Sequence, residues 1–112
     1  MGTPPPASVA QFAKLAKQLA EDGKKEAPHR EGFGTGSLFV GRKMFGVLDA
    51  TGALVLKLPP ARVQALIAAG SGSPWHPGSG KPLKEYVAVG FERRARWFAL
   101  AKESRTYMRS KR

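Results

Sequence analysis

Three short apolar segments separated by tight turns occupy the middle of the chain, and they restrict its possible folds more than any other feature. Residues 37–40 and 43–48 flank a turn at residues 41–42, and residues 53–58 follow a second turn at residues 49–52. Turns this short join neighbouring strands that run in opposite directions. The segment therefore predicts an antiparallel meander of three strands.

The third of these strands also indicates how the sheet is oriented. Side chains alternate between the two faces of a strand, so Leu54, Leu56 and Leu58 share one face while Val55 and Lys57 share the other. A lysine opposite a row of leucines predicts that the second face is exposed to solvent. The leucine face is then expected to meet the helices.

Helical patterns lie on both sides of the meander. Ser8, three residues before Gln11, has capping-box spacing and predicts the start of a first helix that ends at Gly23. Its expected apolar stripe consists of Val9, Phe12, Ala13, Ala16, Leu19 and Ala20. A second helix is predicted from Pro60 to Gly70, and a last helix from Glu92 to about Met108.

The remaining segments complete the predicted order of elements. Residues 24–36 and 71–82 are polar and rich in glycine, which is typical of loops, and residues 86–89 form a further short strand. Residues 1–7 are rich in proline and are expected to be a disordered tail. The order helix, three strands, helix, one or two strands, helix predicts an α+β domain over residues 8–110, with helices packed on an antiparallel sheet.

The inventory of reactive side chains is poor. The chain has no cysteine, and His29 and His76 are its only histidines, so neither a metal site nor a cofactor is predicted. The glycines between Gly32 and Gly36 lead into a strand rather than a helix, which does not suit a phosphate-binding loop. Without a nucleophile and base pair, we expect a protein that is not an enzyme.

The amino terminus and the hydropathy pattern bear on location. The first residues lack the charged and apolar regions of a signal peptide, and no apolar run reaches the roughly 20 residues that cross a bilayer. The absence of cysteine is consistent with a reducing compartment, where disulfides are rare. These features predict a cytoplasmic protein that does not enter a membrane.

Charge is the strongest indication of a partner. Nineteen Lys and Arg residues face eight Asp and Glu residues, a net charge of +11, and residues 92–112 hold eight basic residues against two acidic ones. Projected as an α-helix, one arc of the last helix should dock on the sheet: Trp97, Leu100, Ala101, Ser104, Tyr107 and Met108. Beside it lies a basic arc, with Phe98 in its middle, that consists of Arg94, Lys102, Arg105 and Arg109.

These patterns support several functions. The first hypothesis is binding of nucleic acid, with DNA favoured, through phosphate contacts of the basic arc together with Lys57 and Lys84. No helix-turn-helix, zinc finger or aromatic RNA-binding motif is present, so base-specific recognition is not predicted. The alternatives are an adaptor that binds an acidic protein, a ligand-binding loop at residues 71–85 that gathers Trp75, His76, Lys81 and Lys84, and a solvated basic face that only improves solubility.

The chain also resembles a known family. The run from Gly32 to Leu48, the segment 54–59 (LVLKLP) and the later segment 77–87 are similar to TfoX N-terminal-domain-like proteins and to the related YjbR/MmcQ group. The resemblance covers about residues 8–110. It implies a two-layer fold of the order α-β-β-β-α-β-β-α, shared with secretion-chaperone-like domains, in bacterial cytosolic proteins often described as DNA-binding.

The resemblance implies less about the site. It supplies no catalytic motif, and Lys57, Lys84 and Tyr86 match recurrent positions of the family to which no role is attached. The second domain that TfoX carries has no counterpart in this sequence, so a role in competence is not expected. A monomer or a weak homodimer is the expected assembly.

Overall fold

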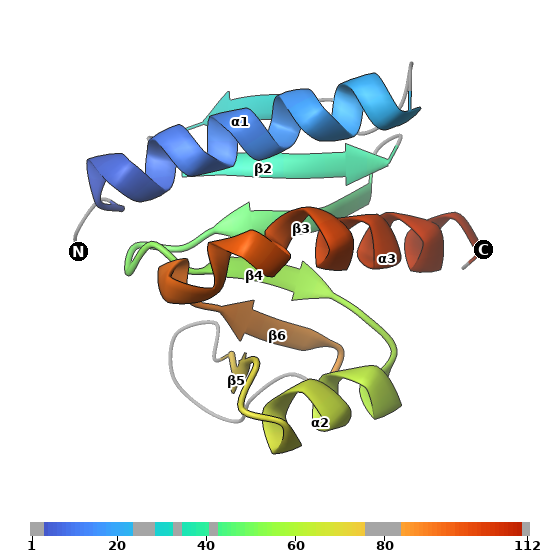
Figure 1. Ribbon diagram of the computed structural model, residues 1–112. Helices are drawn as coiled ribbons and strands as arrows, with labels where there is room; N and C mark the ends of the chain where they lie inside the picture. The colour runs from blue at the N-terminus through green and yellow to red at the C-terminus, as the bar shows by residue number, and fades with distance from the viewer. Residues whose placement is uncertain (1–3, 24–28, 33–34, 41–42, 76–83, 111–112) are drawn as a thin grey trace.

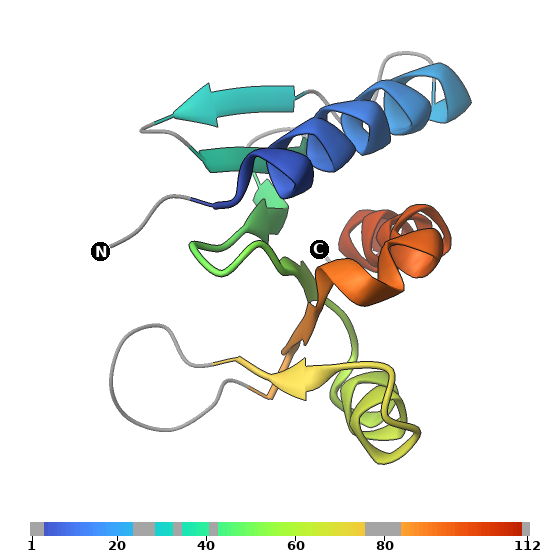
Figure 2. The same cartoon turned by 60° about the vertical axis from the view of Figure 1, so that its left-hand side comes forward.

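The chain folds into a twisted antiparallel sheet with its helices packed on one face (Figure 1). A computed structural model describes residues 4–23, 29–32, 35–40, 43–75 and 84–110. In a view turned away from that of Figure 1, the helices lie along one side of the sheet (Figure 2). This arrangement confirms the predicted α+β class with helices on an antiparallel sheet.

Within the described residues, six strands form the sheet in the order β1-β2-β3-β4-β6-β5. Their bounds are β1 His29–Gly32, β2 Thr35–Val40, β3 Lys43–Leu48, β4 Leu54–Lys57, β5 Ser73–Pro74 and β6 Tyr86–Val89. Strands β2, β3 and β4 are the predicted meander, and each pairs antiparallel with the next. The chain then crosses to β5 and returns as β6, which pairs with β4.

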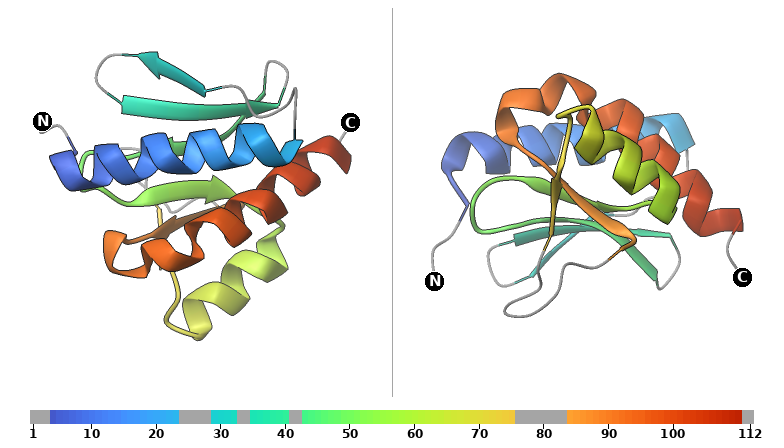
Figure 3. Two further views of the ribbon diagram at one scale, coloured as in Figure 1. Left: turned by 45° about the horizontal axis from the view of Figure 1, so that its top comes forward. Right: turned by 90° about the horizontal axis from the view of Figure 1, so that it is seen from below.

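Three α-helices and one 3₁₀ helix complete the part of the fold that the structure describes. The α-helices are α1 Pro6–Gly23, α2 Pro60–Ala68 and α3 Trp97–Ser110, and the 3₁₀ helix η1 spans Phe91–Arg96. Helices α1 and α3 lie next to each other over the sheet (Figure 3), with α3 packed on β2, β3 and β4. Helix α2 packs against β5 and β6 at the other end of the sheet.

One hydrophobic core lies between the helices and the sheet. Trp97, at the start of α3, is fully buried, and its indole nitrogen donates to the carbonyl oxygen of Val89 at 3.1 Å. Helix α1 contributes Phe12, Leu15, Ala16 and Leu19. The predicted docking arc of the last helix is confirmed, since these residues are buried: Trp97, Leu100, Ala101, Ser104 and Met108, with Tyr107 partly buried.

The first helix differs from its prediction in the residue at which it begins and in the residues of its apolar face. It begins at Pro6, because the amides of Ser8 and Val9 donate to the carbonyl oxygen of Pro5 at 3.0 and 3.1 Å. Ser8 is therefore inside the helix, and part of the expected tail is helical. Leu15 is buried although the predicted stripe omitted it, whereas Val9 is 41% exposed. The apolar face is rotated toward Leu15 because α1 packs on both the sheet and α3.

The turn at residues 49–52 is confirmed and has a second role. The Asp49 carboxylate accepts bonds from the amides of Thr51 and Ala53 at 2.9 and 3.0 Å. Gly52 has a φ of +94°, and a Cβ atom at this position would lie 2.5 Å from the hydroxyl oxygen of Ser8. The turn thus packs directly against the first turn of α1.

The predicted loop over residues 24–36 is wrong in its second half. Residues 29–32 form β1, which pairs with β2 in a register that joins Arg30 to Ser37. A polar segment without apolar alternation gives no strand signal of its own, because an edge strand of this kind depends on backbone hydrogen bonds to its neighbour. The predicted loop at 71–82 likewise contains the two residues of β5, and residues 76–83 lie outside the described part.

The sheet face opposite the helices is only partly exposed. Lys57 occupies that face, as the alternation along β4 predicts, and 21% of its side chain is accessible. Val55 shares this face and is fully buried. The expectation that solvent covers the whole face is therefore wrong at the centre of β4.

Candidate functional site

A groove between α1 and the start of the last helical segment has two cations and no carboxylate among its described lining residues. It has a volume of about 250 Å³. We call it the α1–α3 groove, and it is lined by Gln11, Lys14, Leu15, Gln18, Arg94, Ala95, Trp97 and Phe98. Lys14 stands on one wall and Arg94 on the other, and none of these described lining residues carries a carboxylate.

The amphipathic pattern of the two walls places these groups. Leu15 and Trp97 are buried and form the apolar base of the groove. Lys14 and Arg94 are both exposed. Two cations and two amide side chains around an apolar base can hold an anionic ligand by ion pairs and hydrogen bonds.

Two of the predicted cations of the last helical segment lie over aromatic rings. The guanidinium carbon of Arg94 is 4.3 Å from the centre of the Phe91 ring, and its Nη1 donates to the Phe91 carbonyl oxygen at 3.2 Å. The Lys102 Nζ is 4.7 Å from the centre of the Phe98 ring. Such cation–π contacts restrict the side chains while leaving N–H groups able to meet a ligand.

Arg105 requires a correction, because it is not a surface cation. The residue is 4% exposed in the core, where Nη1 donates to the Leu19 carbonyl oxygen at 3.1 Å and Nη2 pairs with Asp22. It lies between Ala101 and Met108 on the buried side of α3. Arg105 therefore joins α3 to the end of α1 and does not present its charge to a partner.

The carboxylate of Asp22 forms the ion pair with Arg105. The hydrogen bond from Arg105 is the main reason that the pKa of the Asp22 carboxyl lies below its ordinary value; partial desolvation opposes this shift, and the nearby charges of Lys102 and Arg109 add to it. Arg109, on the exposed side of α3, therefore contributes to the field at Asp22.

A second, larger hollow is a weaker candidate. It measures about 750 Å³ over the outer side of α3, and Asp22 and Glu103 are among its lining residues. Glu103 is held by Arg62, whose Nε and Nη2 donate at 2.8 and 2.9 Å, and this bond raises the pKa of the Arg62 guanidinium. The carboxylates of Asp22 and Glu103 lower the attraction of this hollow for anions. The bidentate bond between Arg62 and Glu103 joins α2 to α3.

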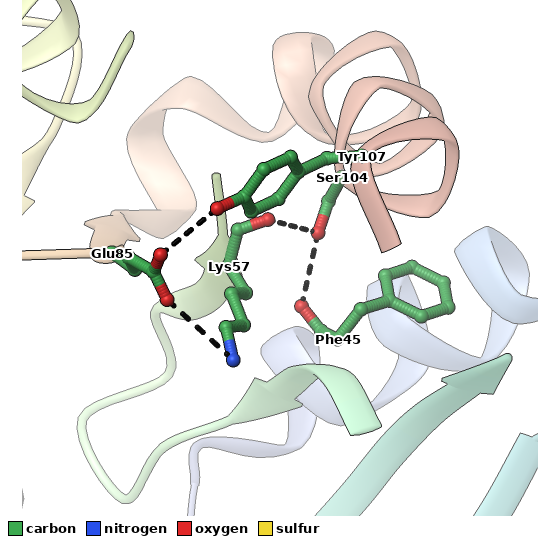
Figure 4. A network of polar contacts seen from close by, with 5 residues as sticks. All are labelled: Phe45, Lys57, Glu85, Ser104 and Tyr107. Carbon is green, nitrogen blue, oxygen red and sulfur yellow. Dashed lines mark hydrogen bonds and ion pairs between the residues drawn. The ribbon is translucent and has the colours of Figure 1, made fainter. Parts of the chain in front are cut away.

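Lys57 and Lys84 belong to a different surface. Lys57 is the cross-strand partner of Tyr86, on the sheet face opposite the helices. Its Nζ lies 3.6 Å from Glu85, which also accepts a 2.9 Å bond from the Tyr107 hydroxyl (Figure 4). Lys84 is exposed just before β6. The sheet separates Lys57 from the α1–α3 groove, so the predicted candidates do not form one patch.

The rest of the polar network in Figure 4 fixes α3 on the sheet. The hydroxyl of Ser104 is fully buried, donates to the Lys57 carbonyl oxygen at 2.5 Å and lies 3.2 Å from that of Phe45. These bonds reach from α3 to β3 and β4. The hydroxyl has one hydrogen to donate, and its short bond to the Lys57 carbonyl oxygen holds the helix against the sheet.

Sequence reasoning missed Lys14 as part of the site. The sequence contained a signal for it, because Lys14 lies between Ala13 and Leu15 on the first helix. The predicted apolar stripe of that helix omitted Leu15, which is buried. Placing Leu15 in the core would have directed Lys14 toward the neighbouring helix. The packing of α1 beside α3, which brings Lys14 and Arg94 to one groove, has no signal in either segment alone.

The predicted ligand-binding loop at residues 71–85 lies only partly within the described residues. His76 and Lys81 lie outside the described residues, so the ligand-loop hypothesis stays untested there. Within the described ranges, no group of three His, Cys, Asp or Glu side chains is placed to hold a metal ion. No helix in those ranges has the length and apolar character needed to cross a membrane.

Comparison of the chain with protein-family models, with curated proteins and with solved structures finds no match.

Proposed function

We propose that this chain is a non-enzymatic domain that binds nucleic acid, with DNA favoured, through phosphate contacts in the α1–α3 groove. The observation that carries the proposal is the pair of exposed cations, Lys14 and Arg94, on opposite walls of a groove with no carboxylate among its described lining residues. Phosphate oxygens bind Lys and Arg through charge-assisted hydrogen bonds.

The charge balance around the groove supports the same ligand. Asp22 and Glu103 are each paired with an arginine, Arg105 and Arg62, and neither acid lines the α1–α3 groove. With a net charge of +11, the chain attracts polyanions over about 8 Å at physiological salt. The resemblance to TfoX N-terminal-domain-like proteins also favours DNA and remains a hypothesis.

Salt-dependent binding of a labelled DNA duplex tests the proposal. Fluorescence anisotropy should show binding at low salt that weakens as salt rises, because phosphate contacts release counterions. Lys14→Gln and Arg94→Gln should each weaken binding and reduce the slope of log K against log salt by about 0.9.

The matched control is Lys43→Gln, which removes the same charge from an exposed position on β3. Equal losses in all three variants would show that only overall charge matters and would refute the groove. No binding to duplex or single-stranded DNA at low salt would refute the function. Retention of an acidic protein from solution after nuclease treatment, without DNA binding, would favour the adaptor hypothesis instead.

A further inference from the structure

A row of three side chains crosses the sheet on the face opposite the helices. Tyr86 on β6 is the cross-strand partner of Lys57 on β4, and its neighbour in the other direction is Trp75, which directly follows β5. The rings of Trp75 and Tyr86 are 5.5 Å apart, and the Lys57 Nζ is 5.7 Å from the Tyr86 ring. Neither the core nor the α1–α3 groove uses these side chains.

The alternation of the strands places the row on this face. Leu56 and Val87, one residue before Lys57 and one after Tyr86, are fully buried in the core under the helices. Their neighbours must therefore point the other way. Trp75, Tyr86 and Lys57 are each partly exposed, and Lys84, two residues before Tyr86, is exposed.

We infer that this row, Trp75, Tyr86 and Lys57, is a base-stacking site for single-stranded nucleic acid. Aromatic side chains on an antiparallel sheet give flat apolar surfaces on which unpaired bases stack, and adjacent cations hold the backbone. Stacking does not depend on base identity, which agrees with a sequence that carries no base-reading motif. Bases inside a duplex are not accessible to such a row, so it differs from the α1–α3 groove in the ligand it takes.

The charges beside the row favour a nucleic acid over a neutral aromatic ligand. Lys57 and Lys84 supply two cations, while Glu85 lies within 3.6 Å of Lys57 and offsets part of its charge. We therefore assign most of the recognition to the two rings and a smaller part to Lys57. The inference rests on the proposed function only in the class of ligand, because the two sites lie on opposite faces of the sheet.

The two tryptophans provide a direct test. Trp97 is fully buried and hydrogen-bonded, so quenching of tryptophan fluorescence by added bases reports on Trp75. The probes are a short oligothymidylate and a strand of the same length made of abasic sites, which has the same phosphates and no bases. We expect the oligothymidylate to bind about tenfold more tightly and to quench the fluorescence.

Variants locate the effect. Trp75→Leu and Tyr86→Leu should lower the affinity for labelled oligothymidylate toward that for the abasic strand, whereas Trp75→Phe should keep most of the preference because it keeps a ring. The preference should also persist as salt rises, since stacking releases few counterions. Val9→Ala, at an exposed apolar position of α1 that does not line the α1–α3 groove, is the control and should keep the preference.

The outcomes separate the two proposals. Equal affinities for the two strands, or tight binding without a change in Trp75 fluorescence, would overturn the stacking site and leave phosphate binding intact. A preference for bases that survives Trp75→Leu and Tyr86→Leu in folded protein would also overturn it. Failure of both strands and of the duplex to bind at low salt would overturn this inference and the proposed function together.

Discussion

The two ends of the last helical segment use arginine in opposite ways. In η1, Arg94 is exposed, lies over the Phe91 ring and lines the α1–α3 groove. In the second half of α3, Arg105 is buried and binds Asp22 and the end of α1. The same residue type thus serves a surface in one region and the core in the other.

The helix geometry explains why the sequence placed both on one stripe. The projection assumed an α-helix from Glu92, but residues 91–96 have 3₁₀ turns with a kink at Arg93, where φ is −111° and ψ is 25°. Arg94 therefore leaves the line that the projection drew through Arg105. A basic stripe in the sequence therefore predicts the side of the helix on which an arginine lies. Whether that arginine is buried depends on which helix packs against that side.

The largest expected effect concerns the buried arginine. Arg105→Met should lower the free energy of unfolding by about 2–3 kcal/mol, because it removes charge-assisted hydrogen bonds from the core. Urea denaturation measures this, and anisotropy with duplex DNA should show unchanged affinity for the folded variant. Arg96→Met, on the exposed side of η1, is the control and should change stability by no more than about 0.5 kcal/mol.

The comparison would fail on either of two results. If Arg105→Met were as mild as Arg96→Met, the buried pair would not stabilise the fold. If it weakened DNA binding as strongly as Arg94→Gln does, Arg105 would belong to the ligand surface after all.

An intermediate effect should appear on the acid side of the pH profile. The pKa of Asp22 is lower in the folded chain than its ordinary value, so its ion pair stabilises the fold fully above that ordinary value, and the contribution is lost as pH falls through the lowered pKa. Asp22→Asn should therefore be less stable than the natural chain near neutral pH. The gap should close between about pH 5 and pH 2.

Thermal unfolding at a series of pH values measures the gap. Glu21→Gln, at the neighbouring exposed position of α1, is the matched control and should show no such closing gap. A constant difference between Asp22→Asn and the natural chain over the whole range would contradict the role of the ion pair.

The smallest effect concerns the ring beneath Lys102. Phe98→Leu should weaken duplex binding about two- to fivefold, because a cation–π contact of this kind is worth about 0.5–1 kcal/mol. A double-mutant cycle with Lys102→Gln checks this by anisotropy. If Phe98→Leu weakens binding equally with and without Lys102, the ring acts by shaping the groove and does not order the cation.

The sequence predicted the meander and the docking arc well because both have a local signal. Leu54 and Leu56 alternate along a strand, and Trp97, Leu100 and Ser104 repeat along a helix. Strand β1 has no such signal, since its order comes from pairing with β2. The site was harder still: Arg94 was predicted, but its partner Lys14 is brought to the groove by the packing of α1 against α3, which is a contact between distant parts of the chain.

The two outer strands of the sheet offer unequal opportunities for adding another strand. Strand β5 has only two residues, and its second, Pro74, has no amide hydrogen to donate, so it is a poor template for further pairing. Strand β1, at the opposite end of the sheet order, spans four residues and contains no proline. If the sheets of two copies of the chain joined, the described backbone favours pairing through β1. The joint would then lie at the opposite end of the sheet from Trp75 and Tyr86.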